Sequence, residues 1–109
     1  MPLMDQGTAK GFSSSFPIEV LKYKTGQTPD QWREIDRGPG YFNPIDGWDL
    51  MVRIRNIDDS QLKQLIQELA VSSAVTFLYL AENRKITDEG LLELKHMPWL
   101  TGLNLSSCS

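Results

Sequence analysis

The chain is poor in the residues from which catalytic and metal sites are usually built. Its 109 residues contain one cysteine and one histidine. A single cysteine excludes an internal disulfide framework and leaves no pair with the spacing of a zinc site. Acidic residues outnumber basic ones and the net charge is -3, so the chain as a whole has no electrostatic attraction to nucleic acid. We therefore expect neither a metal ion nor a nucleic-acid partner.

Long apolar runs are also missing. No stretch approaches the roughly 18 residues that a membrane-spanning helix needs, and the first residues do not read as a basic segment followed by an apolar run. Low cysteine usage fits a reducing compartment. These features predict a soluble, intracellular protein, cytoplasmic in the simplest case, without membrane insertion. The apolar content of 40% predicts one domain with a modest core.

The last third of the chain contains the same pattern twice. Residues 75–83 (VTFLYLAEN) and residues 100–108 (LTGLNLSSC) both read L-x-x-L-x-L-x-x-[N/C], with Val75 in place of the first leucine. Position 75 matches position 100, so the offset between the copies is 25 residues. Self-similarity at a fixed offset of this length is typical of repeat proteins, in which each copy forms one structural unit.

A less regular copy begins at Leu50. Val52 and Ile54 take the places of Leu78 and Leu80, and residues 57–65 match residues 86–94 in type. In each copy the apolar residues after the strand recur at helical spacing, so we expect them to be buried. They are Leu62, Leu65, Ile66 and Leu69 in the first helix and Leu91, Leu94 and Met97 in the second.

These patterns resemble the leucine-rich repeat, and residues 86–94 (ITDEGLLEL) resemble the return arm of its cysteine-containing subfamily. The resemblance implies an α/β fold, a short solenoid with parallel strands on the concave face and helices on the convex face. It also implies that the Asn83 side chain bonds backbone groups of adjacent coils. Cys108 occupies the equivalent position, which implies a small buried structural residue rather than a reactive thiol.

The pattern divides the chain into a disordered lead, residues 1–15, with Phe12 as its one anchor, and a leucine-rich-repeat domain, residues 16–109. Within the domain we expect an N-terminal cap at 16–49, a degenerate repeat at 50–74, a repeat at 75–99 and an incomplete repeat at 100–109. We expect the cap to be irregular and aromatic. Its aromatic residues would cover the open end of the solenoid rather than line a ligand pocket; they are Tyr41, Phe42 and Trp48.

Local signals place the individual elements. Alternation from Phe16 to Tyr23 predicts a short strand, and residues 28–35 (TPDQWREI) begin with a helix-start signature. Asp59 or Ser60 is expected to cap the first repeat helix. The second is expected to start at Thr87 or Asp88 and to stop at Pro98.

Catalytic motifs are not found in the sequence. It contains neither G-x-S-x-G nor a phosphate-cradling glycine loop. The acidic pairs Asp58-Asp59 and Asp88-Glu89 both begin helices, where the helix dipole favours them. His96 falls in a last helical turn, where a cation suits the dipole, and this favours a surface residue over a metal ligand or catalytic base. We therefore expect no enzyme activity and no cofactor.

Side chains that alternate with the inward leucines would form the concave face. Strands in register would place them in three rows: Met51, Phe77 and Gly102; Arg53, Tyr79 and Asn104; Arg55, Ala81 and Ser106. Arginine and aromatic residues dominate binding energy at interfaces, and Arg53 beside Tyr79 predicts a cation–π pair. The candidate partner-binding residues are Met51, Arg53, Arg55, Phe77, Tyr79 and Asn104. The alternative is that they are ordinary sheet-surface residues that support one another.

The sequence stops at Ser109, directly after the third predicted strand. Leu103 and Leu105 would then have one uncovered face, and their strand would have an unpaired edge. Further coils beyond Ser109, pairing with a second copy or a partner, and a short frayed strand all remain open.

Two functions are compatible with these features. The first is a non-enzymatic protein–protein interaction module that binds a partner through the concave sheet face, the exposed C-terminal edge or both. The resemblance also implies an adaptor role, as in the substrate-binding parts of ubiquitin-ligase adaptors. The alternative is a structural or assembly subunit of a larger complex, docked through its cap and its terminal edge.

Overall fold

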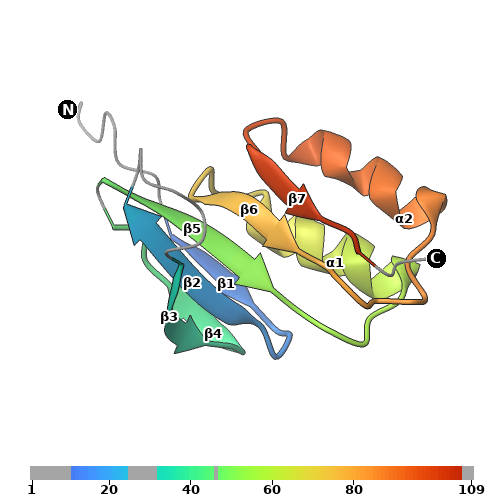
Figure 1. Ribbon diagram of the computed structural model, residues 1–109, viewed down its shortest axis with the longest axis horizontal. Coiled ribbons are helices and arrows are strands. Elements are labelled where there is room, and N and C mark those ends of the chain that lie inside the picture. Colours follow the sequence, from blue (N-terminus) through green and yellow to red (C-terminus); the bar gives the residue numbers. More distant parts are fainter. Residues whose placement is uncertain (1–10, 25–31, 46, 107–109) are drawn as a thin grey trace.

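One five-stranded sheet organises the chain. The computed structural model describes residues 11–24, 32–45 and 47–106. The strands lie in the order β3-β2-β5-β6-β7 (Figure 1). Their bounds are β2 Glu19–Lys24, β3 Arg33–Arg37, β5 Trp48–Arg53, β6 Val75–Tyr79 and β7 Gly102–Asn104. A separate antiparallel pair is formed by β1 Phe12–Ser14 and β4 Gly40–Phe42.

The sheet is mixed, and the expected solenoid is therefore wrong. β2 runs antiparallel to both β3 and β5, whereas β5, β6 and β7 are parallel. Residues 16–49 do not form an irregular aromatic cap. They supply β2, which pairs with β5 along its whole length, from Glu19 opposite Arg53 to Lys24 opposite Trp48. A paired strand satisfies the free edge of β5 directly, so no aromatic cover is needed. The fold is a small mixed α/β fold.

Residues 48–106 form what we call the parallel half. Here the first two strands are each followed by a helical segment: α1 Asp59–Leu69 follows β5, and α2 Asp88–Leu91, continued by the 3₁₀ helix η2 Leu92–His96, follows β6. The predicted rows through Met51 and through Arg53 are confirmed, whereas the row of Arg55, Ala81 and Ser106 lies beyond the paired strand residues. Met51 pairs with Phe77 and Phe77 with Gly102, while Arg53 pairs with Tyr79 and Tyr79 with Asn104. None of the helices in the described ranges is long and apolar enough to cross a membrane.

The main core lies between the sheet and α1. Val20, Val52 and Leu78 come from three neighbouring strands and pack against the buried face of α1, which consists of Leu62, Leu65, Ile66 and Leu69, as predicted. Asp58 caps α1 through a capping box with Gln61. The expected cap at Asp59 or Ser60 is therefore wrong by one residue. The reason is that the Asp59 carboxylate accepts hydrogen bonds from the main chain and hydroxyl of Thr87 instead.

α2 starts at Asp88, within the predicted choice of Thr87 or Asp88, with Thr87 as its N-cap, and the helical segment ends before Pro98. Its first turn lies very close to α1. A Cβ at Gly90 would overlap the Asp59 carboxylate, so glycine is required for the two helices to approach each other here. Met97 is buried in the core, and Leu91 and Leu94 pack against it.

Asn83 performs the task that the repeat resemblance implied. Its side chain is fully buried. The amide oxygen accepts from the main-chain N–H of Ile57 at 3.0 Å, and the amide nitrogen donates to the carbonyls of Ile54 at 2.9 Å and Leu80 at 2.8 Å. This one side chain therefore joins the turns that follow β5 and β6. Cys108, expected in the same position of the next copy, lies outside the described residues.

Residues 11–45 form what we call the antiparallel half, and several expectations fail there. β1 lies within the expected disordered lead, although Phe12 is buried as predicted, with its ring 5.3 Å from that of Phe42. The helix expected to reach Ile35 is wrong for residues 33–35, which belong to β3; residues 25–31 lie outside the described ranges. Of the aromatic residues expected to cover one end, Phe42 is buried but Tyr41 is exposed. The expected strand at residues 16–23 starts later, at Glu19.

Candidate functional site

The outer face of the sheet, opposite α1, carries the residues predicted to bind a partner. Val52 lies between Met51 and Arg53 in the sequence, and Leu78 lies between Phe77 and Tyr79. Both Val52 and Leu78 are in the core, so the alternation of side chains along a strand places the predicted residues on the other face. Met51 and Arg53 lie on β5, Phe77 and Tyr79 on β6, and Asn104 on β7. Arg55 follows the end of β5. The five strand residues share one face, but the structure divides that face into two zones.

The first zone is an aromatic cluster that the chain itself covers. The ring of Trp32 lies 4.2 Å from that of Tyr23 on β2 and 5.7 Å from that of Phe77 on β6, centroid to centroid. Trp32 therefore lies across the outer face of β5, which separates these two strands. Met51, on that face of β5, is only 5% exposed. We call Tyr23, Trp32, Met51 and Phe77 the outer cluster; Trp32 joins the Tyr23 and Phe77 rings, and Met51 is buried on the same face.

Gly102 completes this zone on β7. A Cβ at position 102 would overlap the Phe77 ring. The ring therefore lies directly over the backbone of the next strand. An exposed phenylalanine on the sheet was expected to need a partner, but Phe77 finds its contacts in Trp32 and Gly102.

The second zone is a charged network that connects three strands. Glu19 on β2 accepts a hydrogen bond from Arg53 Nε at 2.6 Å. Glu34 on β3 accepts one from Arg37 Nε. The predicted cation–π pair is confirmed, since the guanidinium carbon of Arg53 lies 5.9 Å from the centroid of the Tyr79 ring. Each charged group in the network thus has an opposite charge beside it.

Hydrogen bonding controls the ionisation of this network. The hydrogen bond from Arg53 lowers the pKa of Glu19 below its ordinary value of 4.5, although partial burial opposes the shift. The same bond raises the pKa of Arg53. The hydrogen bond to Glu34 likewise raises the pKa of Arg37. These groups therefore remain charged at neutral pH.

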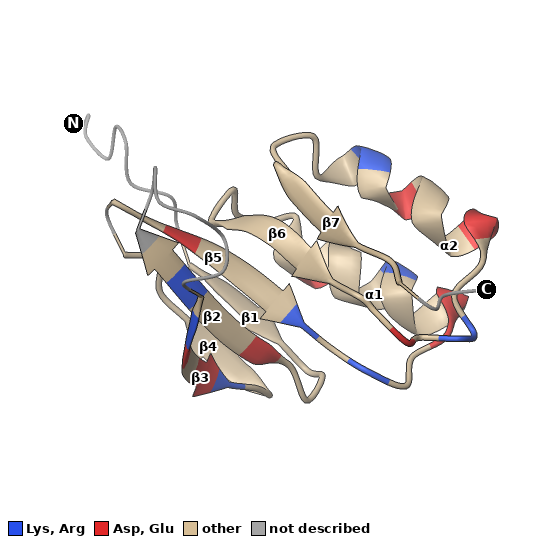
Figure 2. Cartoon of the chain, viewed as in Figure 1, with Lys and Arg blue, Asp and Glu red and all other residues tan. Residues whose placement is uncertain are grey.

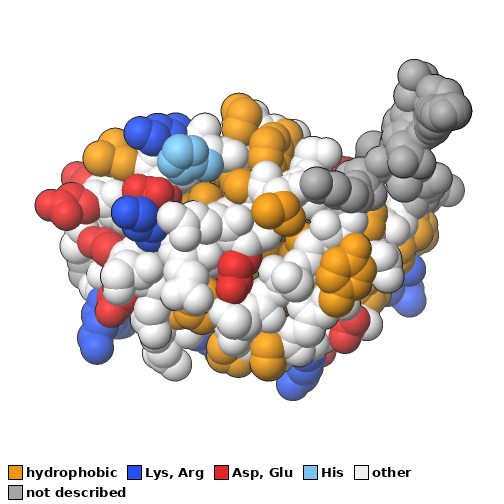
Figure 3. All heavy atoms as spheres, turned by 180° about the vertical axis from the view of Figure 1, so that it is seen from behind, with side chains coloured by type: hydrophobic (Ala, Val, Ile, Leu, Met, Phe, Trp, Pro, Cys, Tyr) orange, Lys and Arg blue, Asp and Glu red, His pale blue; other side chains and the backbone are white. Residues whose placement is uncertain are grey.

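The edge of the sheet at β7 is less complete. β7 is the last strand of the sheet, and no described strand lies on its far side. Leu103 pairs with the core residue Leu78, so it points to the helix side, yet it is 39% exposed. Leu92, at the start of η2, is 67% exposed. The helix side of the molecule shows hydrophobic side chains on both flanks of the pale blue histidine (Figure 3).

Sequence reasoning missed the residues that the antiparallel half adds to the site. Glu19, Trp32, Glu34 and Arg37 come from β2, β3 and the residue just before β3. The strand residues Glu34 and Arg37 show no apolar alternation, since all of β3 is exposed, so the usual strand signal was missing. The one usable signal was the alternation around Glu19, which predicted a strand but not its partner.

The described residues contain no group of three or more histidine, cysteine, aspartate or glutamate side chains that could hold a metal ion. His96 lies at the end of η2, is exposed, and has its Nε2 3.8 Å from a carboxylate oxygen of Glu93. This position agrees with the surface role expected for it.

Comparison with protein-family models, with curated proteins and with solved structures found no match for this chain.

Proposed function

We propose that this chain is a non-enzymatic protein–protein interaction module whose main docking site is the edge of β7. The observation that supports this proposal is the combination of a strand edge that no described strand covers with exposed leucines beside it. Strand addition to a free edge is a common mode of peptide recognition, in which main-chain hydrogen bonds give affinity and alternate side chains give specificity.

The main chain of β7 has the orientation that strand addition needs. The carbonyl of Asn104 accepts a hydrogen bond from the Leu80 N–H at 2.8 Å, so the polar groups of Asn104 face β6. Successive residues of a strand direct their main-chain groups to opposite sides. The N–H and C=O groups of Leu103 therefore face away from the sheet, where a partner strand would bind them.

The apolar surface beside this edge supports the same site. Gly90 faces α1, and each helical residue advances by roughly 100° round the helix axis. Leu92 follows Gly90 by two residues, so its side chain is rotated by roughly 200° round the helix axis and lies on the side opposite α1. Since α2 and β7 lie at the same end of the molecule (Figure 1), Leu92 and Leu103 are exposed at this end. An extended segment with apolar residues on one side would cover both.

The outer face would then serve as the rim of this site. Met51 and Phe77 are engaged in the outer cluster, and Arg53 is engaged by Glu19. Tyr79 on β6 and Asn104 on β7 are paired residues of this face, and both are half-buried. A strand added to β7 continues this face, so its outward side chains would contact Asn104 first.

The proposal places the module inside the cell, because a chain with one cysteine fits a reducing compartment. A second copy of this chain, joined edge to edge at β7, is the main alternative occupant. In that case the chain would be an assembly subunit rather than a binding module.

Selection of short random peptides displayed on phage tests the proposal. The selected peptides are then measured for binding to wild type, to Leu103→Asp and to Val71→Asp. Val71 is an exposed apolar residue just after α1, with 53% exposure, and provides a matched control. We expect selected peptides to show alternating apolar residues, to lose binding to Leu103→Asp and to keep binding to Val71→Asp.

Two further variants separate the edge from the sheet face. Arg53→Glu and Tyr79→Ala change the outer face and leave Leu103 in place. If they abolish peptide binding while Leu103→Asp does not, the docking site is the outer face and the edge proposal is wrong. Sedimentation of the protein alone identifies the remaining alternative, because a dimer that Leu103→Asp dissociates indicates a second copy as the occupant.

A further inference from the structure

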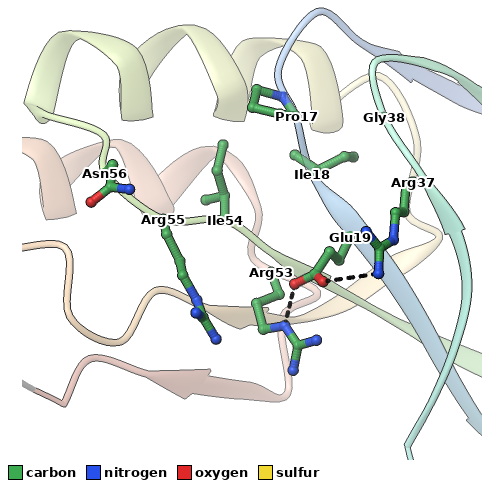
Figure 4. Close-up of a pocket in the computed structure, with 9 residues that line it drawn as sticks. All are labelled: Pro17, Ile18, Glu19, Arg37, Gly38, Arg53, Ile54, Arg55 and Asn56. Atoms are coloured by element: carbon green, nitrogen blue, oxygen red, sulfur yellow. Dashed lines mark hydrogen bonds and ion pairs between the residues drawn. The ribbon is translucent and has the colours of Figure 1, made fainter.

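A cavity of about 440 Å³ lies where β2 begins and β3 and β5 end. Three arginines line it: Arg37 from β3, Arg53 from β5 and Arg55 from the segment after β5 (Figure 4). Figure 2 shows positive and negative residues side by side on β2 and β3, but positive residues alone at the end of β5 and just beyond it. This concentration of arginine is unexpected in a chain with a net charge of -3.

The neighbouring carboxylates use only part of the donor capacity of these arginines. Glu19 and Glu34 accept hydrogen bonds from the Nε atoms of Arg53 and Arg37. The terminal nitrogens lie farther from them, with Arg53 Nη2 3.9 Å from Glu34 and Arg37 Nη2 4.0 Å from Glu19. Within the described ranges, these terminal nitrogens form no hydrogen bond. Glu19 and Glu34 thus orient the two guanidinium groups and leave their terminal N–H groups available.

Arg55 is available in full. It is exposed and makes no hydrogen bond or ion pair with the described part of the chain. In Figure 4 its side chain lies beside that of Arg53, without a dashed line to any residue. Asn56 follows with a φ of 63°, a left-handed turn that changes the direction of the chain at the wall of the cavity.

The charge balance of the cavity favours an anion. Three arginines oppose two carboxylates, Glu19 in the cavity wall and Glu34, which lies 3.9 Å from Arg53 Nη2, and this leaves one positive charge without a carboxylate. Arginine groups are more weakly hydrated than ammonium groups, and their planar forks match the oxygens of phosphate and carboxylate groups. The unpaired charge belongs to Arg55.

We propose that this cavity binds a phosphate monoester. Such a group carries a charge of about -1.5 to -2 at neutral pH and offers three strong acceptor oxygens. Its three oxygens can accept from N–H groups of the three arginines that line the cavity, whereas a carboxylate offers two oxygens in one plane. The cavity is larger than a phosphate group alone, so a small organic part fits beside Pro17 and Ile18. This site is separate from the β7 edge and does not depend on it.

Titration with glycerol phosphate, followed by NMR of the arginine Nε–H groups and the backbone amides, tests the proposal. The ionic strength is held constant with sodium chloride. We expect saturable shifts at Arg37, Arg53, Arg55 and Asn56. Arg55→Gln should weaken binding about tenfold, as expected for the loss of one charge-assisted contact. It should not change the melting temperature, because Arg55 has no partner within the described residues.

Arg33→Gln is the matched control, since Arg33 is an exposed arginine on β3 outside the cavity lining. Equal weakening by Arg33→Gln and Arg55→Gln would show general charge attraction and overturn the site, as would shifts that do not saturate. Acetate that binds as tightly as glycerol phosphate would overturn the phosphate assignment. A phosphoserine tripeptide is titrated in parallel. Tighter binding of the tripeptide than of glycerol phosphate would indicate a phosphorylated side chain as the ligand, and tighter binding of glycerol phosphate would indicate a free ester.

Discussion

The two halves of this molecule reach the same sheet by different routes. In the parallel half, strands and helices alternate, Val52 and Leu78 are buried at matching repeat positions, and the buried Asn83 amide joins the turns that follow β5 and β6. In the antiparallel half, β3 is exposed along its whole length. It pairs with β2 through the main chain, and the ion pairs of Arg37 with Glu19 and of Glu34 with Arg53 also connect it to β2 and β5. A buried amide with several partners contributes more to stability than a surface ion pair. The parallel half should therefore dominate the free energy of unfolding.

The largest expected effect comes from breaking the link between the two repeat turns. Asn83→Ala removes three buried hydrogen bonds and leaves the Ile57 N–H without its acceptor. We expect a loss of roughly 2–4 kcal/mol in the free energy of unfolding, because buried unsatisfied polar groups are costly. Urea denaturation measures it. Asn104→Ala is the control, since that side chain makes one exposed contact with the Ser106 N–H; equal losses in the two variants would contradict the account.

A second substitution tests the contact between β6 and β7. Gly102→Ala places a methyl group where the Phe77 ring lies. Overpacking of this kind costs roughly 1–3 kcal/mol. The same substitution in a Phe77→Ala background should cost much less, because the ring that it displaces is gone. A double-mutant cycle by thermal or urea denaturation measures the coupling, and additive effects would show that the ring does not lie over Gly102.

A third prediction concerns the attachment of β1 to α1. Glu68 accepts hydrogen bonds from the Ser14 hydroxyl at 3.0 Å and from the Ser15 hydroxyl at 2.6 Å. Glu68→Ala should cost about 1 kcal/mol, because the contacts are charge-assisted but partly exposed. The loss should be local, with faster hydrogen exchange in β1 and unchanged exchange in β6. Gln67→Ala, at an exposed neighbouring position, should change neither the stability nor the exchange rates. If Glu68→Ala speeds exchange in β6 as much as in β1, the attachment is not local.

The smallest expected effect concerns the charged network of the antiparallel half. The pKa of Glu19 is lowered in the folded protein, chiefly by its hydrogen bond with Arg53. Its stabilising contribution is therefore present above the ordinary value of 4.5 and is lost as the pH falls through the folded-state pKa. Since the Glu19 side chain is partly exposed, the contribution should remain below about 1 kcal/mol.

Comparison of wild type with Glu19→Gln by urea denaturation at several pH values measures this contribution. The difference between the two proteins should be greatest near neutrality and should disappear in acid. A constant difference across the whole range would mean that Glu19 does not stabilise the fold through its charge. The ionic strength must be fixed, because salt screens exposed pairs.

The contrast between the halves also explains what could be predicted from the sequence. The offset between the repeat copies determined which residues of β5, β6 and β7 are neighbours, and the rows through Met51 and Arg53 were predicted correctly. The bonding role of Asn83 followed from the same resemblance. The overall fold class was predicted wrongly, because the repeat copies contain no information about β2, the strand on the other side of β5.

The antiparallel half could not be read from local patterns. In residues 33–37 (REIDR) the apolar residues follow neither the period of a strand nor that of a helix. These residues form β3 because β2 offers them a free edge. The helix signature at Thr28-Pro29-Asp30 competed with this pairing and misled the assignment of Ile35. The position of Trp32 over β5 depends on contacts with Tyr23 and Phe77, which are distant in sequence. Long-range contacts of this kind override local propensity.

The same reasoning limits the candidate site. The rows of the outer face could be predicted, but not that Trp32 would bury Met51 or that Glu19 would engage Arg53. Leu103 at the β7 edge is covered on one side only, by β6, and Arg55 beside the cavity makes no ion pair or hydrogen bond with the described residues. They are the positions at which the two proposals place external ligands.

Hydrogen exchange at the Leu103 amide tests the central proposal most directly. Leu103 directs its N–H away from the sheet, whereas the N–H of Asn104 faces β6. Addition of a selected peptide should slow exchange at Leu103 in proportion to the bound fraction and leave Asn104 unchanged. Unchanged exchange at Leu103 in the fully bound protein would contradict the account, because the partner would then bind elsewhere than the β7 edge.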